Sequence, residues 1–124
     1  MTKNIIFSPD APAAIGPYSQ AVEINGTLYV SGQIALAAFE AGASIEEETE
    51  QVMKNMGHIL TAAGYTYQNV VKCTIFVKDM GHFAQINAIY GSFFSDNFPA
   101  RETVEVARLP KDVRVEISCI AYKS

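Results

Sequence analysis

The chain has 124 residues, 49% of them apolar, and a formal net charge of −4. This length and composition predict one folded domain over residues 1–124 and exclude an intrinsically disordered chain. Because nucleic-acid binders need clustered lysines and arginines to replace phosphate counterions, the acidic balance argues against general binding of RNA or DNA.

The first predicted elements form a β-hairpin. Residues 18–24 and 27–33 are rich in β-forming residues, and Asn25-Gly26 between them is typical of a type I′ turn, in which both central residues take positive φ. A short strand at residues 5–7 precedes the hairpin. The Ala-rich stretch 33–43 that follows is predicted to be a loop.

Two helices and a strand are predicted in the middle of the chain. The first helix begins after Ser44, whose side chain forms a capping box with Glu47, and ends before Gly64. Residues 70–77 alternate as a strand, and Asp79 is placed to cap a second helix. That helix carries an apolar face made of Phe83, Ile86, Tyr90, Phe93 and Phe94.

The chain ends in two predicted strands, near residues 101–107 and 113–122, which residues 109–112 join as a second hairpin. The element order indicates an α+β fold, a sheet with two helices packed on one face. Since the other face is too apolar to suit exposure to water, the pattern favours a homo-oligomer. Residues expected on that second face include Thr74, Phe76, Ile120 and Tyr122.

Ionisable side chains on the last two strands are the first candidates for a functional site. Arg101 and Thr103 share one strand face, and Arg114 shares a face with Glu116 on the following strand. An arginine can grip a carboxylate with two parallel hydrogen bonds, and a partly buried glutamate can move protons for an attacking water. The alternative, which the pattern alone favours, is an ordinary cross-strand ion pair.

Three further residues are candidates to line a pocket. Ser31 is followed by Gly32, and a small hydroxyl beside a glycine permits close approach of a ligand, although the pattern alone favours a turn or bulge. Tyr18 either presents its hydroxyl from a rigid turn or packs at the start of a strand. Asn87 interrupts the apolar face of the second helix, where a buried amide either caps a neighbouring loop or contacts a ligand.

Other classes of site and location are not indicated. His58 and His82 lack metal-ligand spacing, and Cys73 and Cys119 fall on apolar strand faces, so we expect no metal site and two buried thiols. Residues 1–8 lack the pattern of a signal peptide, and no apolar run approaches the ~20 residues of a membrane helix. We therefore expect a soluble cytoplasmic protein without contacts to membranes.

Four separate motifs, in the same order, resemble those of the RidA/YjgF family. They are the segments 11–20, 31–34, 98–101 and 104–113, with the sequences APAAIGPYSQ, SGQI, FPAR and VEVARLPKDV. The resemblance covers essentially the whole chain as a single RidA-like domain, and it points to the archetypal RidA-like subgroup.

The resemblance implies a chorismate-mutase-like fold, in which three subunits pack their sheets into a central barrel and the active sites lie between subunits. It also implies a 2-iminobutanoate/2-iminopropanoate deaminase, a hydrolase that acts on C–N bonds without a cofactor. Such an enzyme converts reactive 2-enamino and 2-imino acids, such as 2-aminoacrylate, into 2-keto acids and ammonia, as a form of metabolite damage control.

Position by position, the resemblance also implies roles for individual residues. Arg101 matches the arginine that binds the substrate carboxylate, and Glu116 matches the acidic residue that positions or activates water. Asn87 matches a further pocket position that binds substrate, and the backbone around Thr103 matches the pocket wall.

Two more pocket positions are matched by Ser31 and Tyr18. In the mechanism that follows, Arg101 fixes the substrate, and Glu116 accepts a proton from attacking water and returns it to the leaving nitrogen. Ser31 or Tyr18 relays protons or orients the water.

Two departures from the family pattern bear on substrate range. Many relatives carry Ser-Cys after the arginine, where this chain has Glu102-Thr103. The loop at residues 35–40 lacks the usual prolines and Thr-Gly turn. Both changes affect the expected shape of the pocket.

Two other classes of function remain open. A non-catalytic protein could bind 2-keto acids or other small carboxylates at the same arginine. Endoribonuclease activity or translation inhibition has been attributed to some relatives, but the net charge of −4 fits it poorly.

Overall fold

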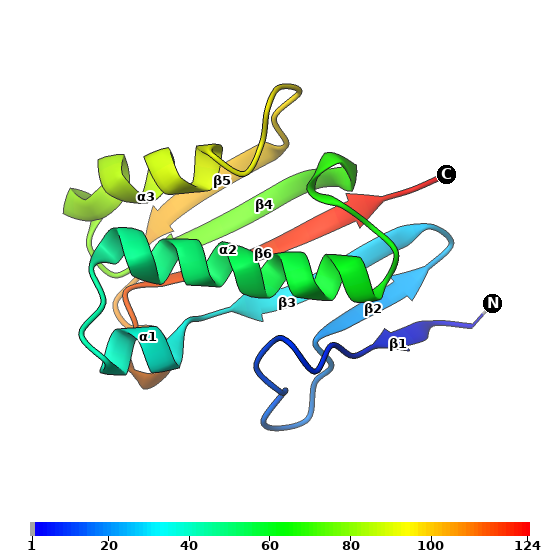
Figure 1. The fold of residues 1–124 in the computed structure, drawn as a ribbon, viewed down its shortest axis with the longest axis horizontal. Coiled ribbons are helices and arrows are strands. Elements are labelled where there is room, and N and C mark those ends of the chain that lie inside the picture. Colours follow the sequence, from blue (N-terminus) through cyan, green and yellow to red (C-terminus); the bar gives the residue numbers. More distant parts are fainter. Residues whose placement is uncertain (1) are drawn as a thin grey trace.

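The computed structural model describes residues 2–124 as a six-stranded mixed sheet with helices on one face (Figure 1). The order across the sheet is β1-β2-β3-β6-β4-β5. All neighbouring strands are antiparallel except β4 and β5, which are parallel. This confirms the predicted α+β fold class. The strands are β1 (Asn4–Ile6), β2 (Ala21–Ile24), β3 (Thr27–Gln33), β4 (Val70–Val77), β5 (Ala100–Glu105) and β6 (Val115–Tyr122).

The N-terminal hairpin forms where the sequence predicts it. Asn25 and Gly26 have φ angles of 51° and 83°, which a type I′ turn requires. The turn joins β2 to β3, with Ile24 paired to Thr27. β1 pairs with the other edge of β2 and lies one residue before its predicted position.

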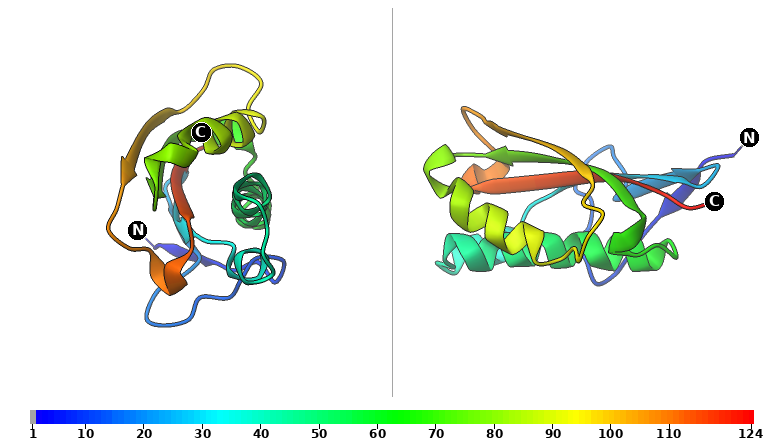
Figure 2. Two further views of the ribbon diagram at one scale, coloured as in Figure 1. Left: turned by 90° about the vertical axis from the view of Figure 1, so that its left-hand side faces the viewer. Right: turned by 90° about the horizontal axis from the view of Figure 1, so that it is seen from above.

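Two helices, α2 (Ile45–Ala62) and α3 (Phe83–Gly91), cover one face of the sheet (Figure 2). The predicted capping box is present: the Ser44 side chain accepts from the Glu47 backbone N–H, and the Glu47 carboxylate accepts from the Ser44 N–H. Gly64 follows the helix with a φ of 82°. Short 3₁₀ turns complete the connections at Tyr67–Asn69, Met80–His82 and Pro110–Asp112.

The hydrophobic core lies between the helices and the sheet face that they cover. Burying each large apolar side chain there contributes about 1.5–3 kcal/mol, so this single layer supplies most of the driving force for folding. The alternation along β4 and β6 therefore fixes which face each of their residues occupies. Fully buried members of the core include Leu28, Val52, Met53, Met56, Ile59, Leu60, Val77, Val115 and Ile117.

Two predicted connections are wrong. Residues 33–43 are not all loop, because Leu36–Glu40 form a short helix, α1, that packs against α2. The C-terminal strands do not form a hairpin either: β5 pairs only with β4, and β4 separates it from β6. A parallel pair needs a crossover, and α3 supplies it between β4 and β5.

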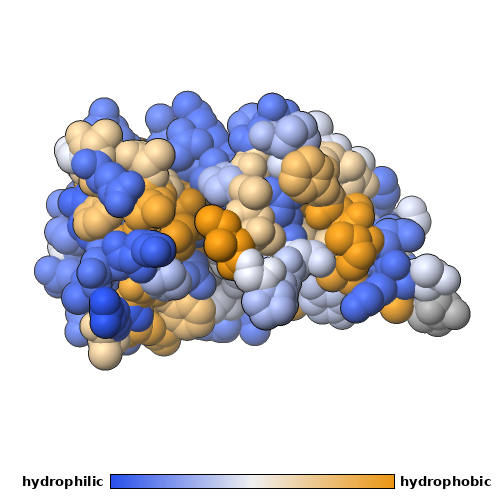
Figure 3. Space-filling model, turned by 90° about the horizontal axis from the view of Figure 1, so that it is seen from below, coloured by the Kyte–Doolittle hydropathy of each residue, from blue (hydrophilic) through white to orange (hydrophobic). Residues whose placement is uncertain are grey.

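The sheet face away from α2 and α3 carries large apolar groups, as predicted. Tyr29 and Tyr122 on this face are about half exposed, and Val104 is 42% exposed. Further apolar patches are visible on the side of the molecule that carries β1 and the loop after it (Figure 3). The loop contributes Ile15, which is 89% exposed. Apolar surface of this extent is typical of a protein–protein interface.

Candidate functional site

A cavity of about 480 Å³ opens beside Arg101 at the edge of the sheet. Arg101 lies on β5, an edge strand, and α3 packs over that edge. One cation among aromatic and apolar walls suits a small ligand that carries a carboxylate. The remaining lining residues are Asn87, Tyr90, Gly91, Phe98 and Pro99.

Arg101 is held by side chains of α3. Its Nη1 donates a hydrogen bond to Oδ1 of Asn87. Its guanidinium carbon lies 5.5 Å from the ring centroid of Phe83 and 5.4 Å from that of Tyr90. Within residues 2–124, no carboxylate forms an ion pair with Arg101. Its charge is therefore free to bind an acidic ligand.

Asn87 is exposed, so the prediction that the helix buries it is wrong. Asn87 lines the cavity, because α3 packs over the edge of the sheet that β5 forms. Thr103 lies two residues after Arg101 on the same face, in register with Ile75. Its hydroxyl is buried and has no hydrogen-bond partner among the described residues. Thr103 does not itself line the cavity.

Glu116 lies on β6, in register with Phe76 of β4. Burial raises the pKa of its carboxyl group. In the part of the chain that the structure describes, no ion pair involves this carboxyl. A half-buried carboxyl with a raised pKa holds a proton more readily than a free glutamate, which suits it to taking up and releasing protons.

Gly32 lies directly against the Glu116 carboxyl. A Cβ atom at position 32 would come within 2.3 Å of Glu116 Oε2. The pairing of β3 with β6 shifts register between Val30 and Gln33, an irregularity that agrees with the turn or bulge that the sequence pattern favours. Gly32 therefore makes room for the carboxyl.

A hydrogen bond of Ser31, near the end of β3, links this strand to the loop that carries Tyr18. The Ser31 hydroxyl donates to the Ser19 carbonyl at 2.6 Å, so its lone pairs remain for a water or ligand. The Gln20 side chain fixes the same loop, accepting from the Ser8 N–H at 2.7 Å and donating to the Pro12 carbonyl at 2.9 Å. Tyr18, near the end of this loop, is 53% exposed.

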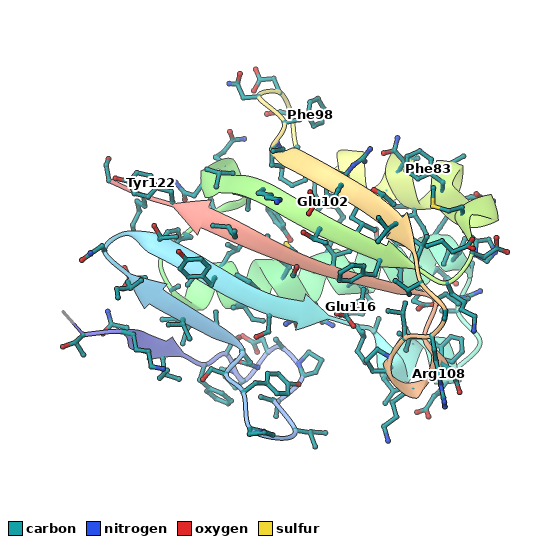
Figure 4. All side chains as sticks on the ribbon, turned by 180° about the vertical axis from the view of Figure 1, so that it is seen from behind. Phe83, Phe98, Glu102, Arg108, Glu116 and Tyr122 are labelled. Carbon is teal, nitrogen blue, oxygen red and sulfur yellow. The ribbon has the colours of Figure 1, made fainter. Side chains whose placement is uncertain are left out.

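The predicted site residues do not all meet within one chain, because Arg101 and Glu116 lie on opposite faces of the sheet. Figure 4 shows Glu116 and Glu102 on the face away from the helices. Because side chains alternate along β5, Arg101 points to the helix face. β4 also lies between β5 and β6. The prediction that Arg101 and Glu116 act from neighbouring strands is therefore wrong for a single chain, and so is the ion-pair alternative.

Arg114 does not share the face of Glu116, contrary to the prediction. Its Nε donates to Oε1 of Glu48 at 2.7 Å, and its backbone N–H donates to Oε2 at 2.9 Å. Glu48 is fully buried. It belongs to the buried face of α2 because it lies three residues after Ile45 and four before Val52. Sequence reasoning counted it only as part of an acidic first turn.

Sequence reasoning placed Phe83 and Tyr90 on the apolar face of the second helix, and it did not identify their contacts with Arg101. Their positions relative to Asn87, four residues before it and three after it, could have revealed a common helix face. Arg101, which contacts that helix face, lies on a strand whose neighbours in the sheet could not be read from the sequence.

The two cysteines are buried, as predicted. Cys73 and Cys119 are paired in register across β4 and β6, and burial raises the pKa of both thiols. Among residues 2–124, no cluster of three or more histidine, cysteine, aspartate or glutamate side chains is arranged to hold a metal ion. None of the described helices is both long and apolar enough to cross a membrane.

A second cavity, of about 600 Å³, lies between the N-terminal loop, α1 and α2. It contains none of the predicted site residues. Its polar groups are largely satisfied internally, since Gln51 donates to Asn55 and Asn55 donates to the Ile34 carbonyl.

Comparison with known proteins gives close matches over the whole chain. A family model described as Endoribonuclease L-PSP matches residues 8–123. A RutC family protein of Synechocystis is 50% identical over 98% of this chain and 97% of its own length. The 2-iminobutanoate/2-iminopropanoate deaminase of Homo sapiens is 44% identical over 99% of this chain and 92% of its own length. The crystal structure of E. coli TdcF with bound serine has a TM-score of 0.91 and 39% identity, covering 98% of this chain and 99% of that one.

Proposed function

This chain belongs to the RidA/YjgF family, and from that premise we propose that it is a hydrolytic deaminase of 2-imino and 2-enamino acids. Its products would be 2-keto acids and ammonia. The human relative, a 2-iminobutanoate/2-iminopropanoate deaminase by name, supports this choice of reaction.

The observation that carries the proposal is the guanidinium of Arg101, which lies beside a small cavity and forms no ion pair with a carboxylate among residues 2–124. A 2-imino acid has a carboxylate next to the carbon that water must attack. Binding that carboxylate at a fixed point also fixes the reacting carbon, which converts a random encounter into a positioned one. Asn87 and the β5 backbone near Thr103 would complete the binding surface.

The chemical steps need a base for water and an acid for the leaving nitrogen. Glu116 would accept a proton as water adds to the C=N carbon and would pass it to nitrogen. It would then take the proton of the new hydroxyl and pass that to nitrogen as the C=O bond forms, the C–N bond breaks and ammonia leaves. Ser31 or Tyr18 would orient the water. These steps use only water and protein side chains, so the proposal includes no cofactor.

A second subunit is required for this mechanism, because the sheet separates Arg101 from Glu116 within one chain. The proposed assembly is a homotrimer in which the outer sheet faces form a central barrel. The edge strand β5 of one subunit would then meet the outer face of the next, where Glu116 lies, and the mechanism would also need Ser31 and the Tyr18 loop bound to it at this interface. The exposed tyrosines of that face support such packing.

The test is a coupled assay in which a threonine dehydratase generates the imine and 2-oxobutanoate formation is measured. Since imines hydrolyse unaided, the signal is the acceleration above the rate without the protein. Arg101→Ala should lower kcat/KM about 100-fold, the loss expected for a charge-assisted bidentate contact. Arg108→Ala is the control, because Arg108 is exposed, pairs with Asp112 and does not line the cavity.

Two outcomes would contradict the proposal. An Arg101→Ala variant as fast as wild type would remove the anchor role. Tight binding of 2-oxobutanoate by a wild-type protein that does not accelerate hydrolysis would instead identify a non-catalytic carboxylate-binding protein.

A further inference from the structure

One side of α3 faces the guanidinium of Arg101. Phe83, Asn87 and Tyr90 are four and three residues apart, a spacing that places side chains on the same side of a helix. Phe83 and Tyr90 are roughly 10.5 Å apart along the helix axis. The guanidinium carbon lies 5.5 Å from one ring centroid and 5.4 Å from the other. Arg101 therefore reaches α3 between the two rings.

These contacts hold the guanidinium without neutralising it. Arg101 is exposed on an edge strand, and its long side chain would otherwise rotate freely. The faces of Phe83 and Tyr90 attract the cation, and the Asn87 carbonyl fixes Nη1. A carboxylate in their place would fix the side chain equally well, but it would occupy the charge that a ligand needs.

We propose that Phe83 and Tyr90 are positioning residues, which hold Arg101 charged and oriented for the carboxylate of the substrate. This inference rests on the proposed function, since it assumes that Arg101 is the anchor. The Tyr90 hydroxyl is buried near the Cys73 thiol and makes no hydrogen bond to Arg101 within residues 2–124. The ring of Tyr90, and not its hydroxyl, therefore supplies the contact.

The first experiment measures the Kd of 2-oxobutanoate by calorimetry. Phe83→Leu and Tyr90→Leu should each weaken binding about fivefold, whereas Tyr90→Phe, which keeps the ring, should bind as wild type. Phe93→Leu is the matched control. Phe93 follows α3 and packs on Tyr67 at a centroid distance of 5.4 Å, so its loss affects the core but not Arg101.

A double-mutant cycle separates positioning from a general loss of structure. Phe83→Leu should add nothing to the weakened binding of Arg101→Ala, because its effect passes through the arginine. An equal loss in both backgrounds would overturn the proposal, as would wild-type affinity in Phe83→Leu.

An NMR measurement tests the geometry independently of ligand binding. In wild type, the two rings should shift the Arg101 Nε–H resonance away from the position of a solvent-exposed arginine. In Phe83→Leu the resonance should move back toward that position, while in Phe93→Leu it should stay. An unshifted wild-type resonance would contradict the inference. If Arg101→Ala binds 2-oxobutanoate as tightly as wild type, the proposed function fails, and this NMR result still decides whether the rings hold Arg101.

Discussion

Glu116 owes its chemical character to its immediate neighbours. Its carboxyl is half-buried on the open sheet face, and burial raises its pKa above the ordinary value of 4.5. Gly32 leaves the space that the carboxyl occupies, since a Cβ there would lie 2.3 Å from Oε2. One missing side chain therefore determines where another group lies and how readily it holds a proton.

Gly32→Ala should push the Glu116 carboxyl out toward water. We expect kcat to fall about tenfold, because a displaced base transfers protons less effectively. A base works when deprotonated, so activity rises with pH through its pKa. As that pKa falls toward the ordinary value in the variant, the acid limb of the pH–rate profile should move to lower pH. An unchanged limb with unchanged kcat would show that Gly32 does not position Glu116.

Glu116→Gln should slow turnover about 100-fold while raising thermal stability at neutral pH. The pKa of Glu116 is raised in the folded state, so folding favours the protonated carboxyl. That stabilisation is complete below the unfolded-state pKa and is lost as pH rises through the folded-state pKa. The Tm of the variant should therefore exceed that of wild type at pH 7 and match it near pH 3. A lower Tm for the variant at pH 7 would contradict this reasoning.

At the scale of elements, an ion pair between the fully buried Glu48 and the partly buried Arg114 joins the start of α2 to the start of β6. Glu48 accepts two hydrogen bonds from Arg114, whose Nη2 also donates to the Ala43 carbonyl at 2.6 Å. The Arg114 guanidinium carbon lies 5.6 Å from the ring centroid of Phe39 in α1. The pair thus connects α1, α2 and β6, which are not joined to one another by the backbone hydrogen bonds of a sheet or a helix.

Glu48→Gln should destabilise the fold by about 3 kcal/mol, because it leaves the Arg114 charge without its buried partner. The same change at an exposed position of the same helix is the control. Glu50, at 52% exposure, forms an ion pair of 3.6 Å with Lys54, and Glu50→Gln should cost less than about 0.5 kcal/mol. Urea unfolding at one fixed protein concentration measures both. Equal losses in the free energy of unfolding would show that burial does not make the Glu48 pair more important for stability than the exposed pair.

At the scale of the whole molecule, the sheet separates the two main candidate residues, Arg101 and Glu116. Arg101 and its α3 contacts lie on one side, and Glu116 lies on the other. Neither group alone meets the needs of imine hydrolysis, so the proposed site requires two copies of the chain. Symmetric association through the apolar outer face would bring the two groups together at each interface.

Complementation between inactive variants tests this arrangement. Arg101→Ala and Glu116→Gln are refolded together in equal amounts, and the mixture is compared with each variant alone. If each site combines Arg101 of one subunit with Glu116 of the next, about one quarter of the sites should carry both groups and regain activity. If both groups came from the same subunit, no mixed assembly would contain an intact site, and activity would stay at the level of the single variants.

The sequence by itself determined the local features. The positive φ of Asn25 and Gly26, the capping box of Ser44 and the inward row of β6 all depend on residues within a few positions of one another. The resemblance to the family, position by position, marked Arg101 and Glu116 as candidate residues. Such signals can be read from the chain because turn chemistry, caps and side-chain alternation are short-range effects.

Only the tertiary structure decided which candidates can meet. Strand pairing depends on contacts between residues far apart in sequence, and it placed β4 between β5 and β6 where a hairpin was predicted. The same long-range packing buried Glu48 against Arg114 and put the rings of α3 beside Arg101. Because each of these contacts depends on which elements become neighbours, no local pattern could separate Arg101 from Glu116 onto opposite faces of the sheet.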